Sequence, residues 1–415
     1  MKFVPAGSLR LLLICLIAAP WLTGCQKGAP AKASALSNLP PDPAANIDCL
    51  VEKPVTEGEF VDAAHAIERA ALEGADPLAQ HFDLAAICDA GLEGMNFSQT
   101  LRVNFKKGFL QSGNNAAFFQ QIATQIQAGG AYRVVHVHFS RGSHRALFRL
   151  SGSGGSNYHD LKLSQDPQGQ IRVSDVYVLT LGEHLSSSIR WMAIQAEAFE
   201  KRLFIQKATQ SDKEFLGNIE TMQQMKQASA AGEHQRVLDL FAQLPPKLRE
   251  YKPMLINRLM AAASLQNVTE YRNTVGDYRR LYPQDRAIDL LTLELLVIDK
   301  QTEAALSAID RIDQFVGGDH ELDLLRGNAW RFVEQFAKAE PYYQKAIAHP
   351  NANPDAYWEL IGISLKTGDA DKTLKCLLEV EPRFRLQMDD LSTLPDYAEF
   401  VKTEQYQEWL KRERK

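Results

Sequence analysis

Cysteine is scarce in this chain, and the few cysteines are widely spaced. Only five occur among 415 residues, and no two of them form a Cys-x-x-Cys pair. This absence excludes a zinc ribbon and a thioredoxin-like redox motif, because both need closely spaced cysteines. Histidine is sparse too, with ten residues and no His-Glu-x-x-His run, so the common zinc-hydrolase signature is missing.

An excess of positive charge is also missing. The chain has 46 Lys and Arg against 51 Asp and Glu, interspersed, for a formal net charge of −5. A phosphate backbone demands a basic patch, so we do not expect a nucleic-acid partner. Beyond residue 25 no apolar run approaches the roughly 20 residues of a membrane-spanning helix. We therefore expect the rest of the chain to be soluble.

What the chain does have is a short apolar segment near its start. Lys2 and Arg10 are basic, and the segment from Leu11 to Ala19 holds nine residues without a polar one. This order of charge, apolar run and small residues is that of an export signal, and nine residues are too few to span a bilayer. We predict a signal peptide over residues 1–24.

The run Leu22-Thr23-Gly24-Cys25 closes this segment and resembles the lipobox of bacterial lipoproteins. The resemblance implies cleavage before Cys25 and a diacylglyceryl group with palmitate-type acyl chains on that cysteine. It implies a lipid anchor in the cell envelope, and Gln26 after the cysteine favours the outer membrane, facing the periplasm. The alternative is an ordinary secretory signal that contains a cysteine by chance.

Residues 25–47 are rich in Ala, Pro, Ser and Lys and cannot bury enough apolar surface to order, so we predict a flexible tether. An exported chain lies in an oxidising space. Two interpretations of Cys49 and Cys88 stay open: a disulfide from the N-terminal lead to a helix, or two small buried hydrophobic residues. Cys376 falls on an apolar helical face and is expected in a core.

Residues 48–186 predict an α+β domain. Thr56 and Glu59 form a capping-box pattern before a helix with one apolar face, and further helical patterns lie near residues 84–92 and 115–128. The period then becomes two over residues 132–139, 145–150, 158–163 and 170–179, with short turns between them, which predicts an antiparallel meander. Helices followed by a curved sheet are similar to the nuclear-transport-factor-2-like family, a resemblance that implies a pocket inside a cone-shaped sheet.

From residue 187 the chain predicts helices: connecting helices over 187–216, repeats over 217–383 and a helical cap over 384–415. Equal steps from Ala339 (339 − 305 = 34) reach Ala305, Tyr271 and Val237 in one direction and Thr373 in the other. Each of these positions falls in the first turns of a predicted second helix. A 34-residue helix-turn-helix period is that of tetratricopeptide repeats, and the region resembles that family.

Single positions within the repeats follow the same resemblance. Gly327 and Trp330 match the small and the large aromatic positions of a first helix. Gly232 and Gly368 fall at the turn between the helices of a pair, while Lys300 and Glu334 stand where a turn glycine is common. We therefore expect an all-α helix-turn-helix solenoid of tetratricopeptide type after the α+β domain.

Two groups of polar residues in the predicted sheet raise the question of chemistry. His136 and His138 alternate along one strand, which indicates either part of a metal site or the solvated face of a strand. Asp160 and Asp175 indicate either a general base beside a pocket or ordinary acids on a strand face. In each case the second interpretation is the favoured one.

The tetratricopeptide resemblance implies a ligand surface on the concave side, formed by the first helices. The period places these residues on or near it: Glu294, Asn328, Arg331, Trp358 and Lys366. An exposed Trp beside Arg and Lys suits a peptide groove, since Trp and Arg often dominate interface energies. A core role for Trp358 is an equally good interpretation.

No residue pattern demands catalysis, a metal or a cofactor. We expect a membrane-anchored, non-enzymatic scaffold that binds protein or peptide partners through its repeats. The alternative is a small-molecule or enzymatic pocket in the α+β domain, with the repeats only positioning it.

Overall fold

The computed structural model describes residues 49–56, 58–95, 97–111, 116–152, 155–202, 217–350, 352, 354–386, 388 and 390–411. The predicted signal peptide, the tether and Cys25 lie outside the described residues. The chain divides into two compact units. The sheet unit holds the described residues up to Thr292 together with Phe315–Gly317, and the C-terminal unit holds Leu293–Gln314 and the described residues from Gly318 onward.

The sheet unit contains a six-stranded antiparallel sheet whose strand order follows the sequence, β1 to β6. This confirms the predicted meander, and the sequence pattern missed the two short edge strands β1 and β6 as well as helices α2 and α4. The elements up to the end of the sheet are β1 (Lys53–Val55), α1 (Glu59–Glu73), α2 (Ala75–Ala79), α3 (Leu84–Leu92), α4 (Gln99–Gln111), α5 (Ala116–Gln127), β2 (Ala131–Ser140), β3 (Ser143–Gly152), β4 (Gly155–Gln165), β5 (Ile171–Val178) and β6 (Glu183–His184).

Helix α1 has the predicted apolar face but not the predicted cap. Ala64, Ile67 and Ala71 recur at helical spacing and are at most 1% exposed. The capping-box prediction was wrong, since the helix begins at Glu59 after Gly58, and no side chain caps it. Gly58 has a φ of 104°, a conformation that glycine adopts without strain, so the chain turns into the helix there.

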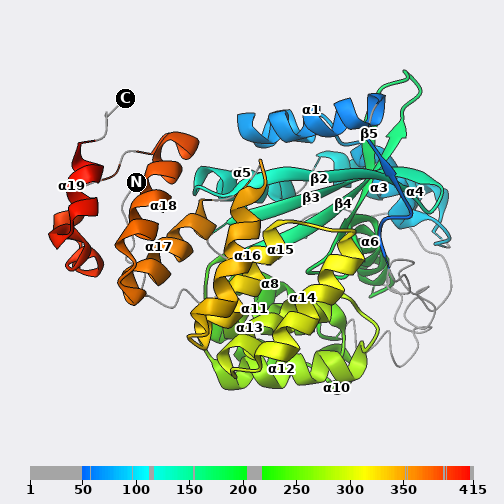
Figure 1. The fold of residues 1–415 in the computed structure, drawn as a ribbon. Coiled ribbons are helices and arrows are strands. Elements are labelled where there is room, and N and C mark those ends of the chain that lie inside the picture. Colours follow the sequence, from blue (N-terminus) through cyan, green and yellow to red (C-terminus); the bar gives the residue numbers. More distant parts are fainter. Residues whose placement is uncertain are drawn as a thin grey trace. The chain divides into compact units, whose positions relative to one another are not determined.

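The two faces of the sheet carry different side chains because successive residues alternate. Register places Phe148 opposite His159 on one face, and Leu147 opposite Asp160 on the other. Helices α1 and α5 cover the first face (Figure 1), and the Phe118 ring of α5 lies 5.4 Å from the His159 ring. On the second face the Tyr177 ring lies 6.3 Å from that of Phe315.

In the described part of the sheet unit, helices follow the last strand, and the last of them, α13, continues into the C-terminal unit. They are α6 (Leu185–Arg202), α8 (Ile219–Ala230), α9 (His234–Gln243), α10 (Pro246–Arg249), α11 (Lys252–Ser264), α12 (Val268–Leu281) and α13 (Ala287–Ile298).

The compact unit does not end where the strands end, near residue 186. Lys252 at the start of α11 donates to the Gly182 carbonyl at 2.7 Å and pairs with Asp285 at 2.5 Å. Trp191 of α6 packs on Tyr251 with ring centroids 3.9 Å apart. These contacts bind the first repeat helices to the sheet, so the sequence boundary separates types of element and not compact bodies.

Ten of the helices form five consecutive pairs in strict register. The second helices of the pairs begin at His234, Val268, Thr302, Phe336 and Ala370, each one full period after the one before (268 − 234 = 34). The five positions that the sequence period aligned all lie in the first turns of these helices and are at most 5% exposed: Val237, Tyr271, Ala305, Ala339 and Thr373. The predicted period of the helix pairs is therefore confirmed.

The turns inside the pairs repeat with the same spacing. Positions 232, 266, 300, 334 and 368 all have φ between 53° and 73°, the left-handed region. At each turn the following amide bonds to a carbonyl five residues back, as in Asp369 N to Ser364 O at 2.9 Å, which is the Schellman closure. Gly232 and Gly368 adopt this conformation freely, whereas Lys300 and Glu334 adopt it against the preference of L-residues.

In the C-terminal unit, the helices from α15 to the C-terminal cap pack around one apolar cluster. Gly327 of α15 allows the close approach of α16, because a Cβ there would lie 2.5 Å from the Tyr343 ring. Trp409 of the cap is fully buried. The remaining elements are α14 (Thr302–Val316), α15 (Glu321–Phe332), α16 (Phe336–Ala348), α17 (Asp355–Thr367), α18 (Ala370–Phe384), η4 (Leu391–Thr393), η5 (Pro395–Tyr397), η6 (Phe400–Lys402) and α19 (Glu404–Leu410).

Candidate functional site

The predicted partner surface centres on an ion pair between two first helices of the C-terminal unit. Arg331 of α15 places its Nε 2.5 Å from Glu359 Oε2 of α17, and the side chains are 38% and 27% exposed. Burial raises the pKa of the Glu359 carboxyl, and the Arg331 charge opposes that rise. Both side chains keep some contact with solvent, so a charged group of a partner can reach the pair.

Asn328 lies one turn before Arg331 on α15, and a buried tyrosine holds its side chain in place. Its Oδ1 accepts a hydrogen bond from the Tyr343 hydroxyl at 2.8 Å, and Tyr343 is fully buried. This bond satisfies the one polar atom of a buried ring and fixes the Asn328 side chain. Asn328 therefore supports the surface beside Arg331.

The other predicted surface residues differ in their surroundings. Trp358 is partly buried and packs against the apolar cluster of the unit, so it has the core role that the sequence left open. Lys366 is exposed, and its Nζ lies 5.6 Å from the centroid of the Phe336 ring. Glu359 and Lys366 are seven residues apart, which places them on one side of α17. The side chain of Glu294 lies outside the described part of the structure.

Sequence reasoning missed Glu359. The 34-residue period aligns equivalent positions of successive repeats, whereas Arg331 and Glu359 are separated by less than one period and occupy different positions of their helices. Only the packing of α15 beside α17 brings them together. The signal that would have found this pair is opposite charges on two neighbouring first helices, at repeat positions that differ by about two helical turns.

The polar residues of the sheet form a buried charge cluster on its second face. Asp160 is fully buried and accepts hydrogen bonds from His138 Nε2 at 2.9 Å and Arg145 Nε at 2.6 Å. Arg141 adds a third bond at 3.1 Å. The solvated-face interpretation of the histidine pair was therefore wrong for His138, which is 0% exposed. The alternation of His136 and His138 along the strand indicates that they share a face of the sheet, but it does not indicate whether other elements cover that face.

The charge cluster also bears on the general-base interpretation of Asp160. Burial alone would raise the pKa of Asp160, but Arg145, the hydrogen bond from His138 and Arg141 outweigh it and hold that pKa well below its usual range. A carboxylate with so low a pKa is a weak base. Asp160 thus neutralises buried cations. Asp175 instead binds the start of α6 by accepting from Ser186 Oγ at 2.5 Å and Ser186 N at 3.2 Å.

His159, on the first face of the sheet, belongs to a separate polar chain. Asn157 Oδ1 accepts from the amides of Tyr158 and Thr180, so its Nδ2 must be the atom that donates to His159 Nε2 at 3.2 Å. The proton of His159 is then on Nδ1 and points to the Tyr132 hydroxyl at 3.2 Å. Burial lowers the pKa of His159 to about 3, so this imidazole is neutral at physiological pH.

The cysteines correct the disulfide interpretation, because Cys49, Cys88 and Cys376 are all free thiols. Cys49 Sγ lies 3.4 Å from the Val51 amide nitrogen and carbonyl oxygen, a local contact two residues along the chain. Cys88 is fully buried in α3, and burial raises the pKa of its thiol to about 12. It therefore behaves as a small hydrophobic residue, as does the buried Cys376 in α18.

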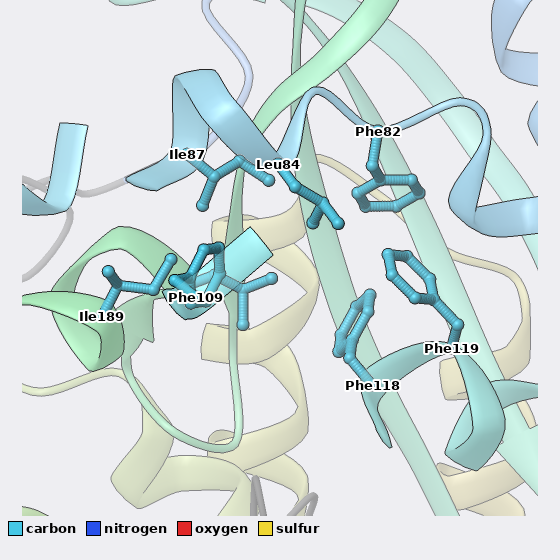
Figure 2. Close-up of a pocket in the computed structure, with 8 residues that line it drawn as sticks. Phe82, Leu84, Ile87, Phe109, Phe118, Phe119 and Ile189 are labelled. Carbon is cyan, nitrogen blue, oxygen red and sulfur yellow. The ribbon is translucent and has the colours of Figure 1, made fainter. Parts of the chain in front are cut away.

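A small apolar cavity lies between the helices that cover the sheet (Figure 2). Its volume is about 10 Å³, close to that of one water molecule, and no polar side chain lines it. Phe118 and Phe119 stand beside each other opposite Phe82. The full lining consists of Phe82, Leu84, Ile87, Phe109, Phe118, Phe119, Leu185 and Ile189. This cavity has neither the size nor the convergent polar groups of a small-molecule site.

Other tests of site chemistry concern only the part of the chain that the structure describes. Within it, no three His, Cys, Asp or Glu side chains are placed to hold a metal ion. None of the described helices combines the length and the apolar character needed to cross a membrane. Compared with protein-family models and with curated proteins, the sequence gives no match.

Proposed function

We propose that this protein is a lipid-anchored interaction scaffold of the cell envelope, whose helix pairs are tetratricopeptide-type repeats that bind a protein or peptide without catalysis. The observation that carries the proposal is the 34-residue register of five helix pairs, kept in the helix starts, the buried positions and the left-handed turns. That register is the period of the tetratricopeptide family. Such arrays act through the extended surfaces that stacked repeats create.

The binding surface in this proposal is the side of α15 and α17 around Arg331 and Glu359. Its charged pair is 38% and 27% exposed, while Trp358 packs against the apolar cluster of the unit and Tyr343 is fully buried. A rigid base under exchangeable charges suits a partner that carries a charge of its own. The small-molecule alternative receives no support from the apolar cavity of the sheet unit. The likeness of that unit to the nuclear-transport-factor-2-like family stays a prediction.

The partner surface is tested by crosslinking in intact cells, followed by mass spectrometry of captured proteins. Arg331→Glu should abolish capture of the main partner. The double variant Arg331→Glu with Glu359→Arg restores the internal ion pair but reverses the displayed charges, so it should also fail. Lys375→Glu changes an exposed charge on α18 and should capture normally. Normal capture by the double variant would show that the pair only maintains the fold.

Two variants at Trp358 distinguish a loss of partner binding from a loss of packing. Trp358→Ala should lower capture, but it also removes a ring that packs on the apolar cluster. Trp358→Phe keeps most of the apolar contact and is the cleaner variant. Equal far-ultraviolet circular dichroism and an unchanged thermal midpoint show that the fold is kept. If Trp358→Phe and Arg331→Glu each captured the partner as well as the wild type does, the proposal that this surface binds the partner would be refuted.

The anchor is tested separately. Cys25→Ser removes the acyl acceptor, so the protein should move from the membrane to the soluble fraction of fractionated cells. Several acyl chains anchor stably because each buried methylene adds about 0.8 kcal/mol. Continued membrane retention of the Cys25→Ser protein in high salt would contradict lipidation at this residue.

A further inference from the structure

The sheet unit has a strongly basic face although the whole chain has a net charge of −5. Five exposed cations mark this face, two at the end of α10 and three on α12. They are Lys247, Arg249, Arg272, Arg279 and Arg280. We refer to these five residues as the α10–α12 basic face.

The acidic residues beside this face do not cancel its charge. Those on or next to α10 and α12 are Glu250, Glu270 and Asp277. Arg258 of α11 pairs with Glu270 at 2.6 Å and with Asp277 at 2.9 Å, so it offsets one of the three negative charges. With Arg258 included, the local sum is 5 + 1 − 3 = +3.

The two helices present these charges together. The Tyr282 hydroxyl after α12 donates to the Glu250 carbonyl after α10 at 2.9 Å, which joins the C-terminal ends of both helices. Figure 1 shows α10 and α12 next to each other at the edge of the sheet unit. Along α12, Arg272 and Arg279 are seven residues apart and so lie on one side of the helix.

Three of these cations are not used in internal ion pairs. Lys247, Arg249 and Arg279 form no ion pair with any described residue, whereas Arg280 pairs with Asp277 at 3.3 Å and the less exposed Arg258 forms two ion pairs. The helix dipole favours cations in a last turn. This effect applies to Arg279 and Arg280 in the last turn of α12, whereas Lys247 and Arg249 belong to a helix of only four residues.

We propose that the α10–α12 basic face lies against an anionic lipid surface, the surface that holds the acyl chains of Cys25. The inference rests on the lipid anchoring in the proposed function. A protein interface is built around apolar or aromatic anchors. Between Arg272 and Arg280 no large apolar side chain is exposed. The nearest exposed ones along the chain are Leu265 before α12 and Val268 at its start, at 38% and 36%. A fluid bilayer with anionic headgroups needs no such anchor and attracts charge alone.

The length of the tether supports this occupant. The predicted tether, residues 25–47, has 47 − 24 = 23 residues and spans at most about 80 Å when extended. The bilayer is therefore present at a high local concentration, which makes a weak electrostatic contact effective. Since the rest of the chain is acidic, repulsion from the same headgroups turns the basic face toward the surface.

The experiment uses the mature chain, from residue 25 onward, with Cys25→Ser so that no acyl chain contributes. It is sedimented with vesicles of phosphatidylcholine alone or with about 30% phosphatidylglycerol, a composition chosen to imitate an anionic membrane. Binding is expected only to the anionic vesicles and should be lost in about 0.5 M salt. Each basic residue near such a surface contributes roughly fivefold to the binding constant.

Charge variants assign the binding to this face. Lys247→Gln, Arg249→Gln and Arg279→Gln together should lower binding to anionic vesicles by on the order of 100-fold. Lys375→Gln, Lys402→Gln and Lys411→Gln together remove the same charge from exposed sites in the C-terminal unit and should change binding less than threefold. Circular dichroism spectra and thermal midpoints confirm that both variants are folded.

Three results would overturn the proposal. The first is equal binding to both kinds of vesicle, and the second is an equal loss of binding in the two triple variants. The third is that the triple variant of the basic face binds vesicles normally but no longer crosslinks to an acidic protein, which would make this face a protein interface. The proposed lipid anchoring is tested independently by fractionation of the Cys25→Ser protein, and the proposed partner binding is tested by the Arg331 variants.

Discussion

Asp160→Asn should destabilise the sheet unit by about 3–5 kcal/mol, the cost of leaving a buried cation without its partner charge. The substitution keeps the shape of the side chain but removes the negative charge 2.6 Å from Arg145 Nε, where the side chains are 0% and 4% exposed. Arg141 loses the same counter-charge. Because Asp160 is fully buried, solvent does not replace that charge, and the penalty is far larger than for a surface pair.

The pH dependence follows from the lowered pKa of Asp160. Its unfolded value is about 3.9. A carboxyl with a lower pKa in the folded state adds stability above the unfolded value and loses it as the pH falls toward the folded value. The difference in unfolding free energy between wild type and Asp160→Asn should therefore be largest above about pH 5 and shrink below about pH 4.

Hydrogen exchange in increasing urea, read on peptides from β3 and β4, measures the sheet unit separately from the C-terminal unit. Glu399→Gln is the matched control, because its partner Lys402 is 66% exposed and Glu399 is 86% exposed. The control should exchange like the wild type. A change of less than about 1 kcal/mol for Asp160→Asn at pH 7 would refute the argument that Asp160 neutralises buried cations.

The helix turns and the helix contacts give further tests. Lys300→Gly relieves a left-handed residue with a φ of 57° and should raise stability by up to about 1 kcal/mol, since the entropy of glycine offsets part of the gain. Gly368→Ala at the equivalent turn should lower the stability by about 1 kcal/mol. Thermal unfolding measures the midpoints of both variants. Midpoints that shift in the same direction would contradict the shared turn geometry. Gly327→Ala places a Cβ 2.5 Å from the buried Tyr343 ring. The clash should cost about 1–3 kcal/mol in urea unfolding, more than the roughly 1 kcal/mol gained in helix propensity, and a more stable variant would contradict it.

The repeats and the strands were the parts of the fold that the sequence predicted best, because both depend on local periodicity. A 34-residue period marks Ala305 and Ala339 directly, and a period of two marks the strands. The start of α1 was mistaken because Thr56 and Glu59 fit a capping box, while Gly58 allows a sharper turn into the helix. Short elements such as β1 and α2 have too few residues to show any period.

The site was harder to predict because its contacts join distant positions. The burial of His138 depends on which elements cover the second face of the sheet, and Phe315, which lies far along the chain in α14, belongs to that cover. The basic face was missed for a related reason. Its cations come from two helices that α11 separates along the chain, and the contact between Tyr282 and Glu250 is what joins the ends of those helices.

The contacts of Lys252 give this charge distribution a mechanical consequence. Lys252 at the start of α11, the helix between α10 and α12, pairs with Asp285 and donates to Gly182, so α11 is fixed to the β5–β6 turn. Tyr278 of α12 adds a bond to Asp285 at 2.7 Å. Because Asp285 and Tyr278 are both buried, α11, α12 and the sheet must turn as one body, since separating them would leave the charge of Asp285 unpaired. A surface that attracts the basic face therefore orients the whole sheet unit and not a single loop.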